Sequence, residues 1–267
     1  MPTATSWQSY DDIPDFGLLY DSVPAYAARG DIRFYAAEAA RARGPVLEIG
    51  CGTGRVLLPM ARAGATVVGL EPSREMLARC RAKLAAESEA TRSRVTLRAG
   101  DAADVDLGTT FALVVAPFRV LQQLVSIDDQ LRCLEAVRRH TAPGARFVFD
   151  VFNPHFALMT ADRSAEQEET PEQQLPDGRT LRRTVRIPRV RWTDQVSEIE
   201  LIYYVAERPG AAPTRYVQAF DMRWYVRAEL IHLLTRSGFR VESIVGDFDG
   251  SPLTDGSPEQ IVRAVRA

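Results

Sequence analysis

Apolar residues follow two different spacings along the first 152 positions of the chain. Short apolar runs, typical of buried strands, alternate with segments in which apolar residues recur every three or four positions, as on one face of a helix. Strands are expected at residues 45–50, 66–71, 94–101, 111–118 and 145–152, and helices at residues 31–44, 55–64, 73–90 and 130–144. This alternation predicts an α/β fold in which helices cover both faces of a doubly wound, parallel sheet.

The pattern changes after residue 152. Polar, turn-rich residues come first, three extended segments follow, and a helix with two strands then resumes the earlier alternation. These segments comprise residues 162–178, then 179–192, 195–210 and 214–225, and finally 229–239, 239–248 and 260–267. We interpret the three extended segments as an antiparallel β-sheet inserted into the main domain.

These patterns divide the chain into three parts. We expect an N-terminal helical cover over residues 1–44, a main domain formed by residues 45–152 and 226–267, and the inserted sheet over residues 153–225. Aromatic residues alternate through the insert, so one of its faces could roof a pocket as a substrate lid, or meet a second subunit in a homodimer. They are Trp192, Tyr203, Tyr204, Tyr216, Phe220 and Trp224.

The charge balance of the chain favours a small molecule as its partner. Of the 267 residues 33 are basic and 35 acidic, a balance that provides no general attraction for nucleic acid or an anionic membrane. Neither an export signal nor a run of about eighteen apolar residues occurs, so we expect no secretion and no membrane anchor. Cys51, Cys80 and Cys133 lack metal-binding or disulfide spacing, which predicts a cytoplasmic protein without a metal site.

Three glycines lie between the first predicted strand and the helix after it, in the pattern E-x-G-x-G-x-G at residues 48–54. Glycine lets the backbone turn sharply there and leaves room for a ligand. Glu71 ends the next strand, where a carboxylate binds the ribose hydroxyls of an adenosine-type ligand. Dinucleotide-binding proteins have G-x-G-x-x-G instead, and Arg55 replaces their usual packing residue. Asp101 ends the third strand at the same edge, where it and the Ala102 amide can meet an adenine ring.

Five segments of the chain resemble, in order and spacing, the successive motifs of class I S-adenosylmethionine-dependent methyltransferases of the small-molecule type. They are LEIGCGTGRV, GLEPSREML, AGDAADVDL, APFRVLQQL and HTAPGARFVFDVF. The resemblance covers residues 20–152 and, through the last helix and two strands, the C-terminal end. It implies a Rossmann-like methyltransferase fold of seven strands, six parallel and the last inserted antiparallel, with S-adenosylmethionine as the cofactor.

The resemblance also implies the roles of individual residues. Glu48 and the glycines would line the methionine end of the cofactor, Glu71 the ribose, and Asp101 with Ala102 the adenine. The positions carried over for cofactor contact are Tyr26, Arg29, Glu48, Gly50, Cys51, Gly52, Gly54, Glu71, Pro72, Asp101, Ala102, Ala116 and Pro117. Candidates for catalytic positioning are Tyr20, Gln123 and His155, and candidates for substrate contact are Tyr20, Arg119, Gln122, Asp221 and Arg223.

The loop after the fourth strand bears on the methyl acceptor. Transfer from a sulfonium needs alignment and exclusion of water more than an elaborate catalytic group. Small-molecule members of the family often place a histidine in this loop, whereas this chain has Gln122 and Gln123, neither of which is a base. This disfavours base-assisted O-methylation, while nitrogen, carbon and oxygen acceptors stay open. The [DNS]PP[YFW] motif of DNA amino-methyltransferases is absent, which disfavours a nucleobase acceptor.

Other functions remain open at the level of sequence. A nicotinamide oxidoreductase shares the glycine turn and the ribose carboxylate, and a non-catalytic S-adenosylmethionine-binding protein would keep the cofactor site without transferring a methyl group. A tRNA or protein methyltransferase could use the six arginines of residues 179–191 to meet phosphate. These arginines also fit a charged edge strand that resists aggregation, or a patch for the carboxylate or phosphate of a small substrate.

Overall fold

The computed structural model describes residues 10–267; the first nine residues of the predicted N-terminal cover lie outside this range. A seven-stranded sheet has the strand order β10-β11-β5-β4-β1-β2-β3. Its strands are β1 (Val46–Ile49), β2 (Val67–Glu71), β3 (Val95–Ala99), β4 (Phe111–Ala116), β5 (Thr141–Phe152), β10 (Phe239–Val245) and β11 (Glu259–Arg266). Strand β11 runs antiparallel to both of its neighbours, and the pairs among β1 to β5 are parallel, so the predicted sheet of six parallel strands and one antiparallel strand is confirmed.

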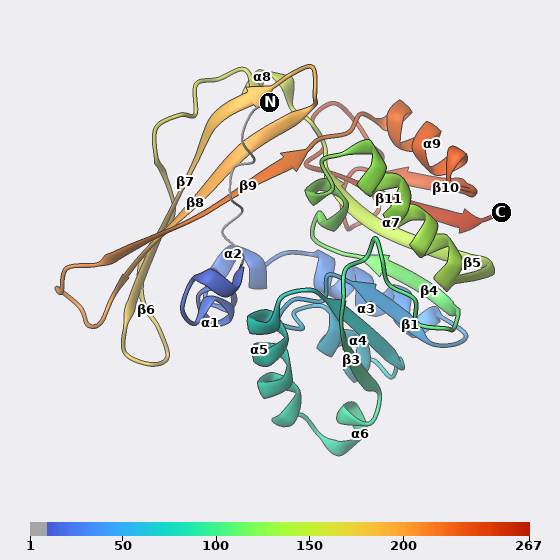
Figure 1. Cartoon of the computed structure of the whole chain (residues 1–267), viewed down its shortest axis with the longest axis horizontal. Coiled ribbons are helices and arrows are strands. Elements are labelled where there is room, and N and C mark those ends of the chain that lie inside the picture. Colours follow the sequence, from blue (N-terminus) through green and yellow to red (C-terminus); the bar gives the residue numbers. More distant parts are fainter. Residues whose placement is uncertain (1–9) are drawn as a thin grey trace.

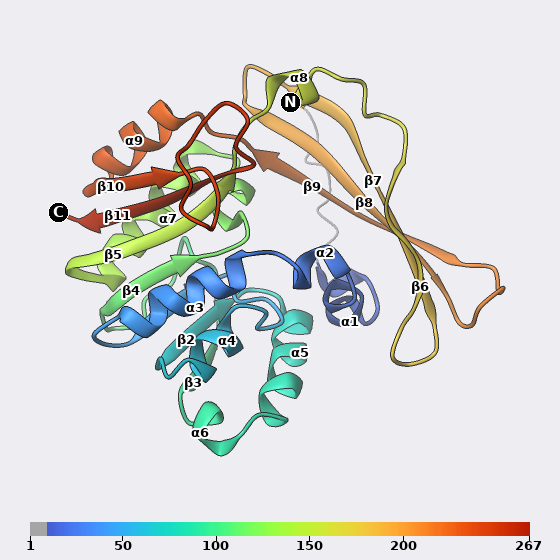
Figure 2. The ribbon, with the colours of Figure 1, turned by 180° about the vertical axis from the view of Figure 1, so that it is seen from behind.

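Helices cover both faces of this sheet (Figures 1 and 2). The N-terminal part contains η1 (Tyr10–Asp12), α1 (Phe16–Asp21), α2 (Pro24–Ala27) and α3 (Asp31–Arg41). The later helices are α4 (Leu57–Arg62), α5 (Arg74–Ala85), α6 (Glu89–Arg92), η2 (Val120–Gln123), α7 (Ile127–His140), α8 (Phe156–Met159) and α9 (Arg227–Arg236). Among residues 10–267, no helix is both long and apolar enough to cross a membrane.

Two apolar clusters flank the main sheet. Leu134 of α7 and Leu234 of α9 belong to one cluster, whereas Tyr35 of α3, Leu57 of α4 and Leu77 of α5 belong to the other. The faces of the sheet are therefore both buried, which explains why its central strands read as continuous apolar runs instead of alternating ones.

The helix predicted at residues 73–90 is divided in the structure. Ser73 caps α5 as the pattern predicts, since its hydroxyl accepts a hydrogen bond from the Met76 N–H at 3.1 Å. The helix ends at Ala85, and Ser88 caps the separate α6 by accepting from the Thr91 N–H at 3.2 Å. A serine hydroxyl in the interior of a helical pattern offers the backbone an alternative partner, and here it begins a new helix.

The helix predicted at residues 130–144 is shifted toward the N-terminus. It begins at Ile127, because the Ser126 hydroxyl accepts a hydrogen bond from the Asp129 N–H at 3.0 Å, and ends at His140. Pro143 and Gly144, expected to end the helix, lie instead in the first part of β5.

The inserted sheet has four strands, β6 (Gln167–Gln174), β7 (Thr180–Arg191), β8 (Val196–Ala206) and β9 (Thr214–Arg223), all antiparallel. The three predicted strands are present, and β6 was missed because its polar sequence with Pro171 has little strand propensity. Such a sequence is tolerated at a sheet edge. The inserted sheet extends beside the N-terminal helices (Figures 1 and 2), and Phe16, Leu19 and Leu181 share an apolar cluster between them.

Two glycines near α4 provide a matched test of packing. Both have positive φ; a Cβ atom at Gly54 would lie 2.8 Å from the Cys80 Sγ atom, whereas one at Gly64 would have no neighbour within 4 Å. Gly54→Ala is expected to lower the free energy of unfolding by about 2–5 kcal/mol, from left-handed strain and overpacking together. Gly64→Ala is expected to lower the free energy of unfolding by only about 1–2 kcal/mol, because it introduces left-handed strain without overpacking. Urea denaturation measures both variants, and equal losses would contradict the packing argument.

Candidate functional site

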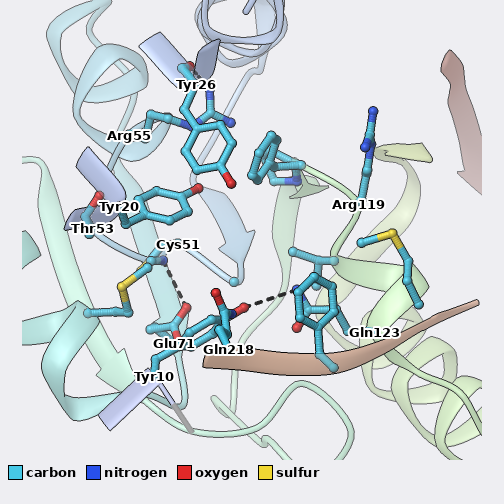
Figure 3. A pocket seen from close by; sticks show the side chains of 18 of the residues that line it. Tyr10, Tyr20, Tyr26, Cys51, Thr53, Arg55, Glu71, Arg119, Gln123 and Gln218 are labelled. Carbon is cyan, nitrogen blue, oxygen red and sulfur yellow. Dashed lines mark hydrogen bonds between the residues drawn. The ribbon is translucent and has the colours of Figure 1, made fainter. Parts of the chain in front are cut away.

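The glycine-rich bend lies at the carboxyl end of β1 and is fixed by the end of β2. Gly50 and Gly52 have φ angles of 70° and 53°. The Gly52 N–H donates to Glu71 Oε2 at 3.0 Å (Figure 3), and the Ser73 N–H donates to Glu71 Oε1 at 3.0 Å. Burial raises the pKa of Glu71, and these two hydrogen bonds oppose the rise. Because a carboxylate oxygen has more than one acceptor site, Glu71 can still accept hydrogen bonds from a ligand.

Glu48 is the second carboxylate of the site and lacks a complete set of partners. Its side chain is only 2% exposed, and among the described residues nothing donates a hydrogen bond to its Oε2 atom. Burial raises the pKa of Glu48 well above its ordinary value. A buried acceptor without a donor is costly, so the position fits a group that brings N–H donors and positive charge to the cavity.

Asp101 follows β3 and supplies the third carboxylate. Its Oδ1 atom accepts a hydrogen bond from the Ala103 N–H at 2.8 Å. Glu48, Glu71 and Asp101, with Gly50 and Gly52, line one cavity of about 600 Å³. Since the carboxyl ends of parallel strands share one edge of the sheet, side chains that are far apart in the sequence meet at this cavity.

Aromatic side chains from the N-terminal helices and from the loop after β4 cover the cavity. The Tyr20 ring lies 4.8 Å from that of Tyr26, which lies 4.9 Å from that of Phe118, between centroids (Figure 3 shows both tyrosines). Phe118 and Arg119 both have left-handed backbone conformations, with φ of 60° and 66°. Non-glycine residues rarely adopt this conformation, and such strain is found most often at ligand sites.

Two arginines attach this cover to the main sheet. Arg29 forms ion pairs with Asp150 at 2.7 Å, Glu259 at 2.9 Å and Asp31 at 3.3 Å. Arg55 pairs with Asp31 at 2.6 Å and donates to the Tyr26 carbonyl at 3.1 Å. The arginine that departs from the dinucleotide-binding pattern therefore holds the aromatic cover in place.

The inserted sheet forms the opposite wall of the cavity. Tyr203 of β8, Gln218 of β9 and Glu169 of β6 line it. Arg183 of β7 is fully buried; its Nη1 donates to the Tyr26 hydroxyl at 2.6 Å, and its Nη2 lies 2.6 Å from Glu169. Arg183 thus connects the inserted sheet to the N-terminal cover around one shared cavity.

Comparisons with known proteins agree with this geometry. The family model described as a methyltransferase domain matches residues 46–144. A dTDP-3-amino-3,4,6-trideoxy-alpha-D-glucopyranose N,N-dimethyltransferase from Streptomyces venezuelae is 28% identical over 91% of this chain and 98% of its own length. The CcbJ methyltransferase from Streptomyces caelestis is 27% identical, with a TM-score of 0.73 over 93% of this chain and 95% of that chain. These similarities identify residues 46–144 as a methyltransferase domain and support the predicted family, the class I S-adenosylmethionine-dependent methyltransferases.

This methyltransferase also resembles a relative solved with the reaction product bound. The glycopeptide N-methyltransferase MtfA, complexed with S-adenosylhomocysteine, is 26% identical, with a TM-score of 0.58 over 89% of each chain. S-adenosylmethionine is therefore the methyl donor, and the nicotinamide oxidoreductase is not favoured. The sequence-based prediction of a small-molecule type of methyltransferase is supported by the comparisons.

Most of the predicted site residues of the methyltransferase line the same cavity. The residues brought together are Tyr20, Tyr26, Arg29, Glu48, Gly50, Cys51, Gly52, Glu71, Pro72, Asp101, Ala102, Pro117, Arg119 and Gln123. Gly54 and Ala116 do not line it: Gly54 packs against Cys80 of α5, and Ala116 is buried in β4. His155 lies at a second cavity, where its Nδ1 accepts from the Leu158 N–H at 3.3 Å.

Three residues expected to contact the substrate have other partners. Gln122 is fully buried; its side chain donates to the Arg223 carbonyl at 2.7 Å and accepts from the Phe152 N–H at 2.8 Å. Asp221 forms an ion pair with Arg191 at 2.7 Å. Neither side chain lines the cavity that holds the three carboxylates, so the substrate role expected for Gln122 and Asp221 does not fit their placement.

Arg223 departs from the prediction for the same reason. Its Nη2 pairs with Glu229 at 2.7 Å, and its Nη1 donates to the Asp194 carbonyl at 2.8 Å. Arg223 therefore attaches the end of β9 to the start of α9 instead of reaching the cavity. A sequence pattern marks such a residue as polar and close to a domain junction, but only the strand register decides which face it occupies.

Several lining residues were missed by sequence reasoning. Phe118 lies inside the APFRVLQQL segment and could have been found there, whereas Tyr10 and Gln218 have no motif to mark them. Burial raises the pKa of Tyr10 to about 12, so its hydroxyl keeps its proton at neutral pH. Glu169 belongs to β6, a strand that was itself not predicted.

Proposed function

We propose that this methyltransferase methylates an amino group of a small polar acceptor of the amino-sugar or peptide class. The support is a similarity that extends over nearly the whole chain, insert included, to a relative named as an amino-sugar N,N-dimethyltransferase. A protein similar in structure is named as a glycopeptide N-methyltransferase. Because the insert supplies much of the cavity wall, similarity across it bears on the acceptor and not only on the cofactor.

The cofactor-binding part of the proposal assigns a role to each carboxylate. Glu48 would hold the ammonium group of the methionine moiety, Glu71 the ribose hydroxyls, and Asp101 with the Ala102 amide the adenine. The fit is supported by the Glu48 Oε2 atom, which is buried without a donor, and by the free acceptor capacity of Glu71. The bound cofactor supplies an electrophilic methyl group on a sulfonium.

The Glu48 assignment predicts that cofactor binding releases a proton. Burial raises the pKa of this carboxyl in the free protein, and a neighbouring ammonium would lower it. Between the two pKa values the free protein carries the proton and the complex does not, so binding releases it. In calorimetry the apparent binding enthalpy should vary with the ionisation enthalpy of the buffer over this pH range. Glu48→Gln should lose that variation; if the variant keeps it, another group releases the proton.

The acceptor half of the cavity suits an amine. Among residues 10–267 no histidine lines it, and its ionisable side chains on the inserted sheet and the segment before it are Glu169, Arg163 and Tyr203. An amine attacks through its own lone pair once neutral, so it needs hydrogen-bond acceptors and an outlet for a proton more than a strong base. Glu169 can accept such a proton, and the tyrosine hydroxyls can orient the nitrogen.

The inserted sheet and the N-terminal helices would act together as a lid. Arg183 joins the two parts through its hydrogen bond to the Tyr26 hydroxyl and pairs with Glu169 within the insert, so closure of the cover would also position the acceptor wall. Excluding water in this way favours methyl transfer over side reactions. A cytoplasmic location and a homodimer formed through the inserted sheet stay predictions; size-exclusion chromatography with light scattering tests the latter.

A paired set of acceptors tests the proposed function. The purified protein is incubated with S-adenosylmethionine and a nucleotide-linked amino sugar, a peptide with a free N-terminal amine, and the counterpart of each with a hydroxyl in place of the amine. Mass spectrometry should show a gain of one or two methyl groups on an amine and none on the hydroxyl counterparts. Transfer to hydroxyls at a similar rate would overturn the nitrogen assignment. Cofactor binding without transfer to any acceptor would favour a non-catalytic binder.

A further inference from the structure

A second cavity of about 620 Å³ adjoins the proposed acceptor wall. It lies between the inserted sheet and the segment after β5. The residues that line both cavities are Arg119, Arg163, Ile187, Ile199 and Met222. Because they share this boundary, one extended molecule could occupy both cavities, with its reactive end beside the cofactor.

Two arginines at the second cavity lack an acidic partner within the described chain. Four of the six arginines of residues 179–191 form ion pairs within the structure, and Arg182 lies over the Tyr204 ring with its guanidinium carbon 4.1 Å from the centroid. Arg189 has no carboxylate within 4.0 Å among residues 10–267, and the same holds for Arg163. Four arginines of this strand are therefore neutralised by ion pairs and Arg182 is held against a ring, whereas Arg189 faces the second cavity without either kind of partner in the part of the chain that the structure describes.

The other polar groups of the lining are compatible with an anion. His155 uses Nδ1 as an acceptor, which leaves Nε2 as a donor. Arg119 is paired with Glu259 at 2.7 Å, and its side chain remains one-third exposed. Asp162 is the acidic residue of the lining, and its Oδ1 atom already accepts hydrogen bonds from the Ser164 N–H and hydroxyl at 2.9 and 2.7 Å.

An exposed aromatic ring completes the lining. Trp192 is 44% exposed, although its ring centroid lies only 6.1 Å from that of Trp224. Large aromatic side chains at the rim of a cationic cavity are typical stacking surfaces for nucleobases. Arginines with an adjacent aromatic ring match the two chemical parts of a nucleotide, its phosphates and its base.

We propose that the second cavity binds the nucleoside diphosphate part of the methyl acceptor, with Arg189 and Arg163 on the phosphates. The inference rests on the proposed function, because it places the amine of the same molecule in the first cavity. It narrows the acceptor class from small polar amines to nucleotide-linked amino sugars.

Calorimetric binding tests the site without requiring catalysis. Thymidine 5′-diphosphate, pyrophosphate and thymidine are titrated into the full-length protein saturated with S-adenosylhomocysteine. Thymidine 5′-diphosphate should bind more tightly than either part, and its affinity should fall as salt is raised. Arg189→Ala should weaken it about tenfold to a hundredfold, the usual effect of losing a charge-assisted hydrogen bond, and Arg163→Ala should act similarly. Arg182→Ala is the matched control on the same strand and should leave the affinity unchanged.

The outcomes separate this inference from the proposed function. No binding of thymidine 5′-diphosphate to the unaltered protein, or equal weakening by Arg182→Ala, overturns the nucleotide site. If pyrophosphate binds as tightly as thymidine 5′-diphosphate, the second cavity is a simple anion site, and the proposal that the nucleobase stacks there is overturned. If the protein methylates a phosphate-free amine and Arg189→Ala leaves kcat/KM unchanged, the nucleotide site falls while N-methylation stands. If nucleotide binding follows the expected pattern but no amine is methylated, the proposed function falls instead.

Discussion

Replacing Asp150 with alanine is expected to lower the free energy of unfolding by about 3–5 kcal/mol, the usual cost of breaking a buried ion pair. Asp150 is fully buried near the end of β5. It pairs with Arg29 at 2.7 Å and accepts hydrogen bonds at 2.8 Å from the Tyr35 hydroxyl and from the Phe118 N–H. Its removal leaves the buried Tyr35 hydroxyl and the partly buried Phe118 N–H without this acceptor, and it frees the left-handed loop that covers the cavity.

Urea denaturation measures this loss, and two further variants interpret it. Asp255→Ala removes the same side chain from an exposed loop and should change the free energy of unfolding by less than about 0.5 kcal/mol. Asp150→Asn keeps the side-chain volume and one acceptor oxygen, so it should lower the free energy of unfolding by less than Asp150→Ala does. A loss below about 1 kcal/mol for Asp150→Ala would show that the network contributes little to stability.

Replacing Glu71 with alanine is expected to weaken S-adenosylhomocysteine binding by at least about a hundredfold. Each charge-assisted hydrogen bond to a ribose hydroxyl contributes about 1.5–3 kcal/mol, and every 1.4 kcal/mol corresponds to a factor of ten. The carboxylate also holds the Gly52 and Ser73 amides at 3.0 Å, so the glycine-rich bend loses its support in the same variant. Isothermal titration calorimetry measures the affinity directly.

Matched variants distinguish the ribose contact from general damage. Glu75→Ala removes a carboxylate from the first turn of α5, outside the cavity, and should leave the affinity unchanged. Glu71→Gln keeps the shape but turns an NH₂ group toward one of the backbone N–H donors, so its affinity should fall between those of the unaltered protein and the alanine variant. An affinity for Glu71→Ala within threefold of the unaltered protein, roughly 0.6 kcal/mol, would exclude Glu71 from the cofactor site.

The local features of the main sheet followed from the sequence. Periodicity marked the strands that contain Glu48 and Glu71 and the strand that Asp101 follows, and the carboxyl ends of parallel strands meet at one edge of the sheet. The N-cap at Ser73 could also be predicted from the sequence, because a serine cap and the N–H that it binds are only three positions apart. Errors arose where two local signals competed, as at Ser88, which divides α5 from α6.

The acceptor side of the cavity depended on contacts between residues far apart in the sequence. Strand β6 forms because β7 offers it a partner, although its own residues have little strand propensity, and Glu169 reaches the cavity only through that pairing. The strand register likewise places Asp221 and Arg223 where they form ion pairs with Arg191 and Glu229, away from the cavity.

The sequence by itself determined the α/β fold, the glycine-rich bend with its neighbouring carboxylates and the resemblance to methyltransferases, because these rest on short-range periodicity and on motifs whose members are close together along the chain. Only the tertiary structure decided which arginines of residues 179–191 form ion pairs, and that Arg182 lies over the Tyr204 ring whereas Arg189 lines the second cavity without an acidic partner among the described residues. Ion pairing depends on distances between strands and segments that no local pattern specifies, since each partner is chosen by the register and packing of the whole insert.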